Sequence, residues 1–500
     1  MNGPIDLIFG LGLIFIAIYV YFKYSYTYWR KKGFPYLEPK FPLGNYPETG
    51  LHGQFNYSIE TKIWYQQIKK LGVKFGGVWS FANKVLVLAD PEYIKDILVK
   101  DFNYFTDRDF YRKPNEPNLE NLFLVGHHKW KNQRQKMSPT FTTAKLRLMF
   151  DTIVDCADGM VKLGEESSEN KQDVVIKDLL EKFTIDVVGC TMFGLNFNCL
   201  LSENPKLRDF SKLAGNPPTI LKILLLLTRI FPKLSSFLGI KTFPDHLMRF
   251  FVELMNDTVS YRKTNKIKRS DLTQTLIDLE ETTRNDPNPF SYGDLTANLI
   301  GFFFAGSDTS SRTIQFTLYY LAQESDIQDR ARKEIHTVLN RHGGKLTYDA
   351  LNEMTYVNQI IDEALRLFPP LMTLSRICNQ DYTFKGTNFT LEKGTPVVIS
   401  IIGLHHDPDL FPDPEKFDPE RFSPENKHKV VPYSYMPFGD GPRICIGRRF
   451  GLMQAGIGLV RILKDFKVDI SSKTKLPLVI KPGGIFIETT EPLYLKLTKL

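Results

Sequence analysis

The chain has 500 residues, 42% of them hydrophobic, with 33 glycines, which is the composition of an ordinary globular protein. The net charge is +8, and the basic residues are spread out, which favours an anionic lipid surface or an acidic protein partner over a nucleic acid. The five cysteines form no C-x-x-C pair, so a disulfide framework, a zinc ribbon and a C-x-x-C-H heme attachment are all disfavoured, and a reducing compartment is indicated.

The first residues predict a membrane anchor. Leu7–Phe22 is uncharged and mostly aliphatic, and as a helix it spans ~24 Å, a little short of a ~30 Å hydrocarbon core. Aromatic residues up to Trp29 extend it to the interface, and the Lys and Arg residues of 23–32 place the remaining chain in the cytosol. A cleaved signal peptide is the alternative, but it needs a basic start and a small-residue cleavage site. We expect an anchor over 1–29 and a basic, proline-rich, stiff linker over 30–45.

Beyond the linker, long helical patterns dominate to about residue 370, and later apolar runs such as TPVVIS and GIFIETTEPLYLKL predict strands of small sheets. The very apolar segment 219–240 contains Lys and Arg and is broken by Pro232, so a second membrane span is disfavoured. Two interpretations of this segment remain open, a hydrophobic lid on the bilayer and a plain core helix.

A long apolar helix is predicted over 291–322. It opens with a capping box, in which Asp294 follows Ser291 by three residues. Its interior holds AGSDTSS, which places a glycine and then polar residues in the middle of a helix that should cross the protein. Either the hydroxyls bond back to the preceding turn, or Gly306 lets a ligand approach or the helix open, with Asp308 and Thr309 directed into a cavity.

A second helix ends in NQIIDEALRLFPP, where Glu363 and Arg366 lie three residues apart on one face. Such a pair usually lies on the solvent-exposed face of a helix. However, Arg421 in FDPERF supplies a second arginine, and a buried glutamate needs more than one donor.

The stretch PFGDGPRICIGRRFG, Pro437–Gly451, surrounds Cys445 with glycines and arginines. A lone thiolate ligand is rare outside heme proteins whose chain supplies one axial ligand to the iron. The glycines permit tight turns and close approach to a flat ring, and a helix from about Ile446 would direct its N-terminus at the sulfur. Arg443 is placed to pair with a ring carboxylate, and Phe438 to screen the sulfur from water. A buried, inert cysteine would explain Cys445 but not its neighbours.

These motifs resemble those of the cytochromes P-450. FGDGPRICIG is similar to the heme-binding pattern F-x-x-G-x-R-x-C-x-G, and AGSDT is similar to the pattern A-G-x-[D/E]-T. EALR resembles E-x-x-R, and PERF supplies the third member of the Glu–Arg–Arg cluster. WKNQR resembles W-x-x-x-R. The likeness covers essentially the whole chain and is strongest to the insect microsomal xenobiotic-metabolising group, which is related to the vertebrate drug- and steroid-oxidising group. It implies a mainly α fold with small β-sheets (α+β), preceded by one N-terminal transmembrane helix, and a single heme-thiolate monooxygenase domain over 46–500.

The resemblance also implies the cofactor and its contacts. The cofactor is heme b, with Cys445 as the axial ligand of the iron, and Thr309 and Asp308 relay protons to the activated oxygen. The remaining heme-binding residues that the resemblance implies are Arg108, Trp130, Arg134, Arg376, Phe438 and Arg443. It implies as well that Glu363, Arg366 and Arg421 form a buried cluster.

The implied electron donor is NADPH, through NADPH–cytochrome P-450 reductase, with cytochrome b5 as an additional partner, in the endoplasmic reticulum membrane with the catalytic domain on the cytosolic side. Several basic residues are candidates for docking the reductase or are ordinary solvated charges: Lys129, Lys131, Arg134, Lys136, Arg448 and Arg449.

The predicted reaction inserts one oxygen atom from O2 into a lipophilic substrate, either a xenobiotic such as a plant toxin or insecticide, or an endogenous steroid or fatty acid. The expected cavity walls are apolar, in 103–125, 205–245, 302–304, 371–374 and 484–486. Two other functions stay open, a hydroperoxide isomerase of the same fold that needs no reductase and a membrane-tethered sensor or carrier of heme or a lipophile. The acid–threonine pair argues against the first, and the intact motifs of Cys445 and Thr309 argue against the second.

Overall fold

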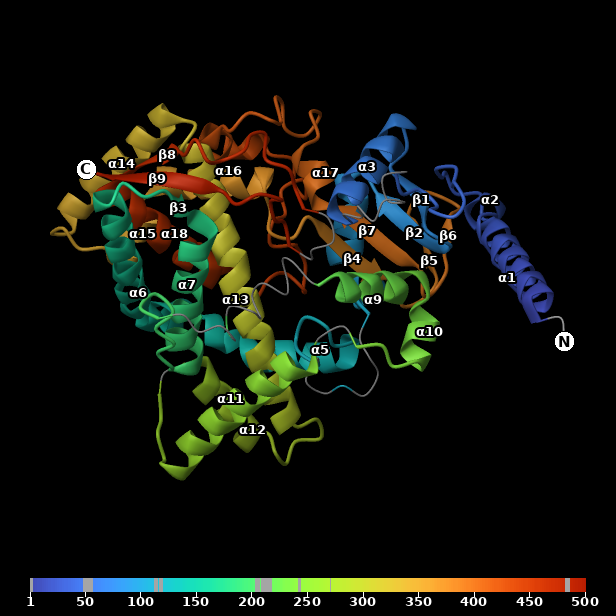
Figure 1. Cartoon of the computed structure of the whole chain (residues 1–500), viewed down its shortest axis with the longest axis horizontal. Coiled ribbons are helices and arrows are strands. Elements are labelled where there is room, and N and C mark those ends of the chain that lie inside the picture. The colour runs from blue at the N-terminus through green and yellow to red at the C-terminus, as the bar shows by residue number, and fades with distance from the viewer. Residues whose placement is uncertain are drawn as a thin grey trace.

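The central helix α13, Tyr292–Leu321, runs through the middle of the protein, as the computed structural model in Figure 1 shows. Both bonds of the predicted capping box are present, because the Ser291 hydroxyl accepts from the Asp294 amide and the Asp294 carboxylate accepts from the Ser291 amide. The structure describes residues 3–47, 57–111, 116, 120–202, 207, 218–241, 244–269, 271–481 and 486–500.

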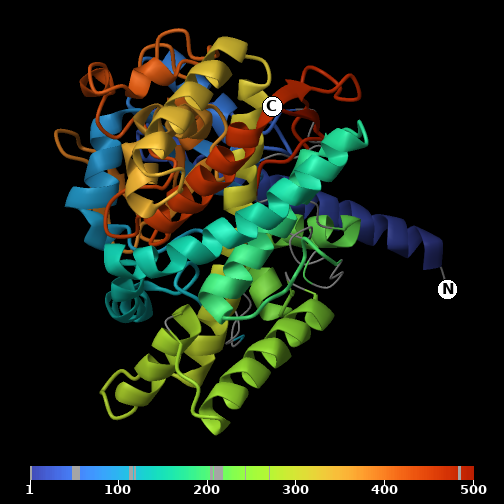
Figure 2. The same cartoon turned by 90° about the vertical axis from the view of Figure 1, so that its left-hand side faces the viewer.

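Most of the other helices pack around α13 and form the larger part of the molecule (Figures 1 and 2). They are α5 (His127–Met137), α6 (Thr143–Glu169), α7 (Ile176–Val188), α11 (Asp245–Thr264), α12 (Leu272–Thr282), α14 (Ser325–Arg341), α15 (Tyr348–Glu353), α16 (Thr355–Leu367) and α18 (Arg448–Asp465). Further helices and helical turns are α3 (Tyr57–Lys70), α4 (Pro91–Lys95), η2 (Asp96–Lys100), η3 (Phe102–Tyr104), η5 (Ser138–Phe141), η6 (Gly189–Phe193), α17 (Ile401–His405), η7 (Pro419–Phe422) and η8 (Lys427–Lys429).

A four-stranded sheet lies on the side of the molecule nearest the N-terminal helix (Figure 1). Its order is β1 (Phe75–Ser80), β2 (Asn83–Leu88), β7 (Pro396–Ser400) and β4 (Thr373–Ile377), and only the β2–β7 pair among these strands is parallel. The smaller sheets are β3 (Val174–Val175), β9 (Tyr494–Lys499) and β8 (Phe466–Ile470), and β5 (Tyr382–Thr383) with β6 (Thr390–Leu391). The expected mainly α fold with small sheets is confirmed.

The first two strands were missed by the sequence pattern, which predicted strands only after about residue 370. All six residues of β1 are buried, so FGGVWS shows no alternation of apolar and polar residues. A sheet buried on both faces gives a continuous apolar run that pattern alone does not distinguish from a helix.

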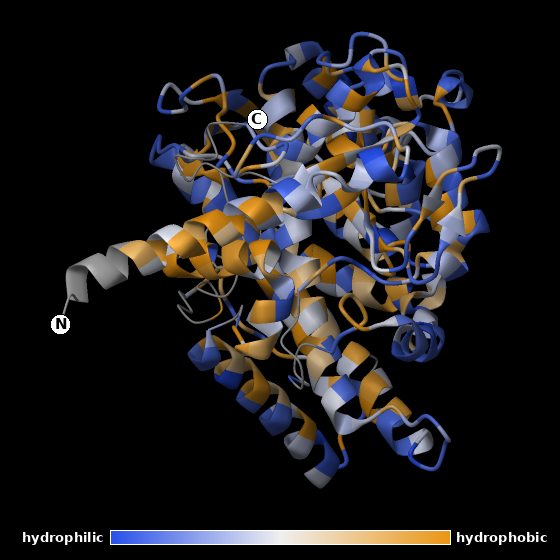
Figure 3. Ribbon diagram, turned by 90° about the vertical axis from the view of Figure 1, so that its right-hand side faces the viewer, coloured by the Kyte–Doolittle hydropathy of each residue, from blue (hydrophilic) through white to orange (hydrophobic). Residues whose placement is uncertain are grey.

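The N-terminal helix α1, Gly3–Ser25, projects from the body as a mostly apolar rod (Figure 3). Within the described residues, one helical segment, Phe9–Lys31, is long and apolar enough to cross a membrane. Large apolar side chains such as Phe9 and Tyr24 are exposed along it. These features agree with the predicted anchor.

The segment that follows the anchor differs from the expected spacer. Trp29, in α2 (Tyr28–Lys31), is fully buried, and its indole N–H donates to the Val78 carbonyl at 3.2 Å instead of lying at a membrane interface. The proline-rich stretch forms bridges from Tyr36 to Gly77 and from Gly44 to Ser80. Gly77 makes this packing possible, because a Cβ atom there would lie 2.3 Å from the Trp29 ring. Residues 28–45 therefore form part of the globular body.

The apolar segment 219–240 folds as two helices, α9 (Thr219–Ile230) and α10 (Pro232–Phe237), with Pro232 at the first position of the second. Leu226 and Ile230 pack against the sheet core, whereas Ile220 and Phe237 are exposed. One face therefore packs as core, as one interpretation expected, and the other is an exposed apolar surface of the kind that the lid interpretation requires.

Candidate active site

A cavity of about 1730 Å³ lies between α13, the Cys445 loop, β4 and α9. Its walls include Phe302, Phe304, Leu371 and Phe486, which agrees with the walls expected from the sequence. Gly484, also expected there, lies outside the described residues. A further wall, not expected from the sequence, comes from the end of α1 and from α2: Tyr21, Tyr24, Ser25, Thr27, Tyr28 and Lys31.

The Cys445 loop has the tight backbone that its glycines predicted. Gly439 and Gly441 have φ angles of 72° and 73°, and a Cβ atom at Gly441 would lie 1.9 Å from the Leu98 carbonyl oxygen. The Cys445 amide donates to the Phe438 carbonyl at 3.0 Å, and both residues line the cavity. The helix α18 begins at Arg448 instead of near Ile446, so Cys445 precedes it by three residues.

The Cys445 sulfur lies deep in the protein but is accessible from the cavity. Burial raises the pKa of its thiol, and the Gly447 amide and the guanidinium groups of Arg108 and Arg134 oppose this shift. A cation bound at the sulfur would add to those opposing effects and favour the thiolate.

Three arginines gather at the base of the cavity, and we call Arg108, Arg376 and Arg443 the cavity arginines. Arg376 and Arg443 are buried, and Arg108 and Arg443 line the cavity. The Nε atoms of Arg108 and Arg376 have no hydrogen-bond partner in the described part of the chain. Burial, together with repulsion from Arg443, lowers the pKa of Arg376 to about 9, and burial and both neighbours lower that of Arg108 well below its usual range.

Among the described residues, little negative charge balances Arg108 and Arg376. Among the described side chains, Asp107 lies within ion-pair distance, with its Oδ1 3.8 Å from Arg443 Nη2. Buried cations keep their charge only when an anion or several acceptors face them. The cavity arginines therefore fit a ligand that carries more than one carboxylate, such as a ring with two propionates.

Helix α5 brings Trp130 and Arg134 to the same part of the cavity, one helical turn apart. Arg134 Nη1 donates to the Ile444 carbonyl at 2.9 Å, next to Cys445. The Arg443 guanidinium lies 4.7 Å from the centre of the Trp130 ring. All six residues predicted to bind heme besides Cys445 thus lie at or beside one end of the cavity.

The basic residues proposed for docking have different environments. Lys129 pairs with Glu120 and Asp294, both at 2.6 Å, and Lys136 pairs with Asp286 at 3.4 Å. Arg134 lines the cavity. The residues that remain suited to an acidic partner are Lys131, Arg448 and Arg449, all outside the protein core.

The polar turn of α13 separates its side chains onto different faces. Thr309 lines the cavity, and its hydroxyl donates to the Ala305 carbonyl at 2.6 Å. Asp308 does not line it; its carboxylate accepts two hydrogen bonds from Arg312, at 3.0 and 3.1 Å, and is 2% exposed. The expectation that both residues point into the cavity is wrong for Asp308, because Arg312, one turn further along α13, binds its carboxylate in the interior, away from the cavity.

Gly306 also differs from its expected role. A Cβ atom at this position would lie 3.1 Å from Val188 and 3.3 Å from Met192, which belong to α7 and η6. The helix continues through it without a break. Gly306 therefore permits close helix packing and does not open the helix toward a ligand.

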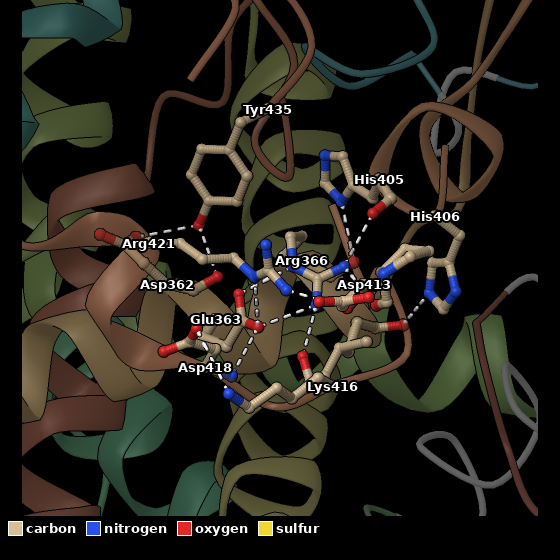
Figure 4. Close-up of polar contacts among 12 residues, drawn as sticks. Asp362, Glu363, Arg366, His405, His406, Asp413, Lys416, Asp418, Arg421 and Tyr435 are labelled. Atoms are coloured by element: carbon tan, nitrogen blue, oxygen red, sulfur yellow. Dashed lines mark hydrogen bonds and ion pairs between the residues drawn. The ribbon is translucent and has the colours of Figure 1, made fainter. Parts of the chain in front are cut away.

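Glu363, Arg366 and Arg421 form the buried cluster that the resemblance implied, which we call the Glu363 cluster (Figure 4). Arg366 binds the Glu363 carboxylate through Nε and Nη2, at 2.7 and 2.8 Å, and both side chains are fully buried. Glu363 also accepts from the Asp418 amide at 2.9 Å, and Arg421 Nε lies 3.4 Å from it. Arg366 donates further bonds to the carbonyl groups of His405, Pro414 and Lys416.

Comparison with known proteins agrees with this geometry. A model of the family Cytochrome P450 matches residues 39–497. The chain belongs to the cytochrome P450 family. Its relatives include Cytochrome P450 6a2 of Drosophila melanogaster, 36% identical over 98% of this chain and 100% of the relative, and Cytochrome P450 6A1 of Musca domestica, 32% identical over 98% and 97%. Cytochrome P450 9e2 of Blattella germanica is 35% identical over 95% of this chain and 94% of the relative.

Membership of the family makes the chain a monooxygenase and implies a heme cofactor. The predicted resemblance to insect cytochromes P450 is confirmed by these three relatives. Besides the wall from α1 and α2, the sequence analysis also missed Arg312, which is 1% exposed and binds Asp308. An arginine in an apolar central helix, four residues after an aspartate, was the signal that could have identified it.

Proposed function

We propose that the protein is a membrane-anchored heme-thiolate monooxygenase that inserts one oxygen atom from O2 into lipophilic substrates. The observation that carries the proposal is the convergence of Cys445, the cavity arginines and Thr309 on one mostly apolar cavity. A thiol, a set of undercompensated cations and a hydroxyl are the groups that heme ligation, propionate binding and proton handling each require.

Cys445 is the residue that would hold the heme iron through its sulfur. The heme, when bound, supplies the electron transfer and oxygen activation that protein side chains lack. Its propionates would pair with Arg108, Arg376 and Arg443, with Trp130 and Arg134 beside them, and Phe438 would shield the sulfur from water.

Thr309 is the proposed catalytic residue for proton handling. Its hydroxyl lies on the cavity surface and donates to the Ala305 carbonyl, and its oxygen can accept a hydrogen bond from water in the cavity. Asp308 is assigned as a positioning residue, because its carboxylate is held by Arg312 away from the cavity.

The apolar cavity walls support a lipophilic substrate. The resemblance to the insect microsomal xenobiotic-metabolising group favours xenobiotics such as plant toxins and insecticides as substrates, and three of the relatives come from insects. Residues of α1 and α2 together with α9 extend the cavity toward the anchor, which would allow a substrate to enter from the bilayer.

The proposed partners are NADPH–cytochrome P-450 reductase, through which NADPH supplies electrons, and cytochrome b5. The proposed location is the endoplasmic reticulum membrane, with the domain on the cytosolic side. The apolar N-terminal helix and the basic side chains of Lys131, Arg448 and Arg449 on the Cys445 side of the protein support both proposals.

Replacement of Cys445 by alanine tests the ligand. The reduced carbonyl complex of the wild-type protein should show the long-wavelength Soret band of a thiolate ligand, and Cys445→Ala should lose it. A variant that kept this band would show that another cysteine binds the iron.

Replacement of Thr309 by alanine tests the monooxygenase reaction. With reductase and a substrate that shifts the heme spectrum, product formed per NADPH should fall several-fold and hydrogen peroxide should rise, with heme content unchanged. Thr317→Ala is the matched control, since this buried threonine lies two turns further along α13 and its hydroxyl donates to the Thr313 carbonyl. Unchanged coupling in Thr309→Ala would contradict the proton-handling role of Thr309, whereas product formation without NADPH and reductase would favour the isomerase.

A further inference from the structure

Five charged side chains gather in the interior beside the polar turn of α13. Lys177 and Glu181 come from α7, Asp308 and Arg312 from α13, and Glu488 from the segment before β9. Lys177 Nζ lies 2.7 Å from Glu488 and 3.3 Å from Glu181, and Arg312 binds Asp308 and lies 3.9 Å from Glu488. The mechanism proposed above uses only Asp308 among these residues.

These charged side chains bind a short segment, residues 486–488, that ends at the cavity. Arg312 Nη1 donates to the Ile487 carbonyl, and the Arg312 guanidinium lies 5.8 Å from the centre of the Phe486 ring. Lys177 holds the side chain of Glu488. Residues 486–488 are therefore bound to α13 through Arg312 and to α7 through Lys177.

Phe486 is the part of this segment that reaches the substrate space. Its ring lines the cavity and lies 5.8 Å from the ring of Phe304, which lines the cavity from α13. The positions of the Phe486 and Phe304 rings determine how much space remains for a ligand on the Thr309 side of the cavity.

We propose that Arg312 and Lys177 are positioning residues that hold Phe486–Glu488 against α13 and thereby fix the Phe486 ring as a wall selecting substrates by size. Asp308 acts with them, because its bidentate contact fixes the guanidinium in the orientation that reaches Ile487. The inference rests on the proposed function insofar as the cavity takes lipophilic substrates.

The physical basis is the cost of separating buried charges. Arg312 is 1% exposed, so its three acceptors, two on Asp308 and one at Ile487, fix it more firmly than a surface pair would. A ring held in place before binding costs a ligand no ordering free energy, whereas a loosened ring must be ordered by each ligand that packs on it.

The experiment compares two carboxylates that share Lys177. Glu488→Gln weakens the contact that holds the segment, and Glu181→Gln makes the same chemical change where no contact to the segment exists. Burial raises the pKa of Glu181, so a neutral side chain is well tolerated there. Both changes leave Arg312 paired with Asp308, which limits the risk of misfolding.

Two ligands report on the heme-loaded, full-length protein. Testosterone is a bulky probe that must pack on the cavity walls, and imidazole is a small probe that reaches the iron without touching them. Glu488→Gln should weaken testosterone binding, read as the spectral dissociation constant, about threefold or more, with imidazole binding unchanged. It should also speed amide hydrogen exchange in 486–490, whereas Glu181→Gln should change neither quantity.

A double-mutant cycle with Phe486→Ala decides whether the effect passes through the ring. In the Phe486→Ala background, Glu488→Gln should have no further effect on testosterone binding. Equal effects in both backgrounds, or an unchanged dissociation constant and exchange rate in Glu488→Gln alone, would overturn the inference.

Failure of this inference can be told apart from failure of the proposed function. The carbonyl band and imidazole binding depend on Cys445 and the iron, not on Phe486. If the wild-type protein showed neither the carbonyl band nor imidazole binding, the proposed function would be contradicted. If it showed both, but Glu488→Gln bound testosterone as tightly as the wild type, only the role of the cluster would be contradicted.

Discussion

The protein contains two groups of buried arginines that differ in how their charges are balanced. In the Glu363 cluster, Arg366 has a bidentate carboxylate and three backbone carbonyl acceptors. In the cavity arginines, Arg376 donates to the carbonyl of its own neighbour, Ser375, and its Nε has no partner among the described residues. Within the described residues, the charges of the first group are paired, whereas Arg108 and Arg376 of the second carry buried charges that an anionic ligand would neutralise.

The difference separates a structural role from a ligand-binding role. A buried ion pair with every donor satisfied fixes the packing of the segments that supply its acceptors. Buried cations that repel one another destabilise the protein until a ligand neutralises them. Substitutions in the two groups should therefore have opposite effects on the stability of the protein without heme.

Glu363→Gln should have the largest effect. It leaves the Arg366 charge buried without a carboxylate, which typically costs about 3–5 kcal/mol. Little folded, heme-loaded protein should be recovered, as judged by the heme-to-protein ratio and by thermal unfolding.

Glu353→Gln is the matched control for this prediction. Glu353 is an exposed glutamate that pairs with His342 and Arg341 near the surface. Its loss should change stability by less than about 1 kcal/mol. If both variants were equally stable, the Glu363 cluster would not have the structural role assigned to it.

The Glu363 cluster could be predicted only in part from the sequence. The spacing of Glu363 and Arg366 put them on one helical face, and the PERF motif supplied Arg421. The carbonyl groups of His405 and Pro414, about 40–50 residues further along the chain, could not be predicted, because a backbone acceptor carries no sequence signal.

The cavity residues, too, could be predicted only in part from the sequence. Local motifs identified Cys445 and Thr309, but which side chains of α13 meet the cavity depends on tertiary packing, so the motif did not show that Asp308 lies outside it. The burial of Trp29 followed from the absence of a Cβ atom at Gly77, almost fifty residues away, and no periodicity near Trp29 reports that contact. Tertiary packing decided both outcomes.

Acid should weaken the Glu363 cluster through His405. Its Nδ1 donates to the Arg366 carbonyl and its Nε2 accepts from the Met436 amide, both at 3.0 Å, so the ring is neutral in the fold. Burial lowers the pKa of His405 to about 3, whereas the unfolded residue titrates near 6.5. The unfolded chain thus binds the proton first, and the contribution to stability, fully present above pH ~6.5, falls by about 1.4 kcal/mol per pH unit toward pH 3.

His405→Gln isolates this effect, because an amide supplies a donor and an acceptor that do not titrate. Urea unfolding at pH 7.0, 6.0 and 5.0 should show a shallower loss of stability in the variant than in the wild type. Identical pH profiles would mean that other groups, such as Glu415, account for the acid sensitivity.

Arg376→Met should have a smaller effect, with opposite signs in the two states of the protein. Without heme, the variant should be more stable by about 1–3 kcal/mol, because a buried, poorly paired charge is removed. With heme, the loss of a propionate partner should speed heme transfer to apomyoglobin. Arg249→Met, at an exposed arginine of α11, should change neither quantity. Slower heme transfer in Arg376→Met would contradict the role of the cavity arginines.

Arg421→Gln should have the smallest effect and sharpens the boundary of the Glu363 cluster. Arg421 Nε lies 3.4 Å from Glu363, and its Nη2 donates to the Asp413 carbonyl at 2.8 Å, but its side chain is 13% exposed and the Glu363 carboxylate already has Arg366. Water can replace part of what is lost, so we expect a cost of about 1 kcal/mol, well below that of Glu363→Gln. Heme content should stay normal, and the unfolding midpoint in urea should fall only slightly. A loss as large as that of Glu363→Gln would show that the carboxylate needs both arginines, and the cluster would then be a three-residue unit instead of a pair with a peripheral partner.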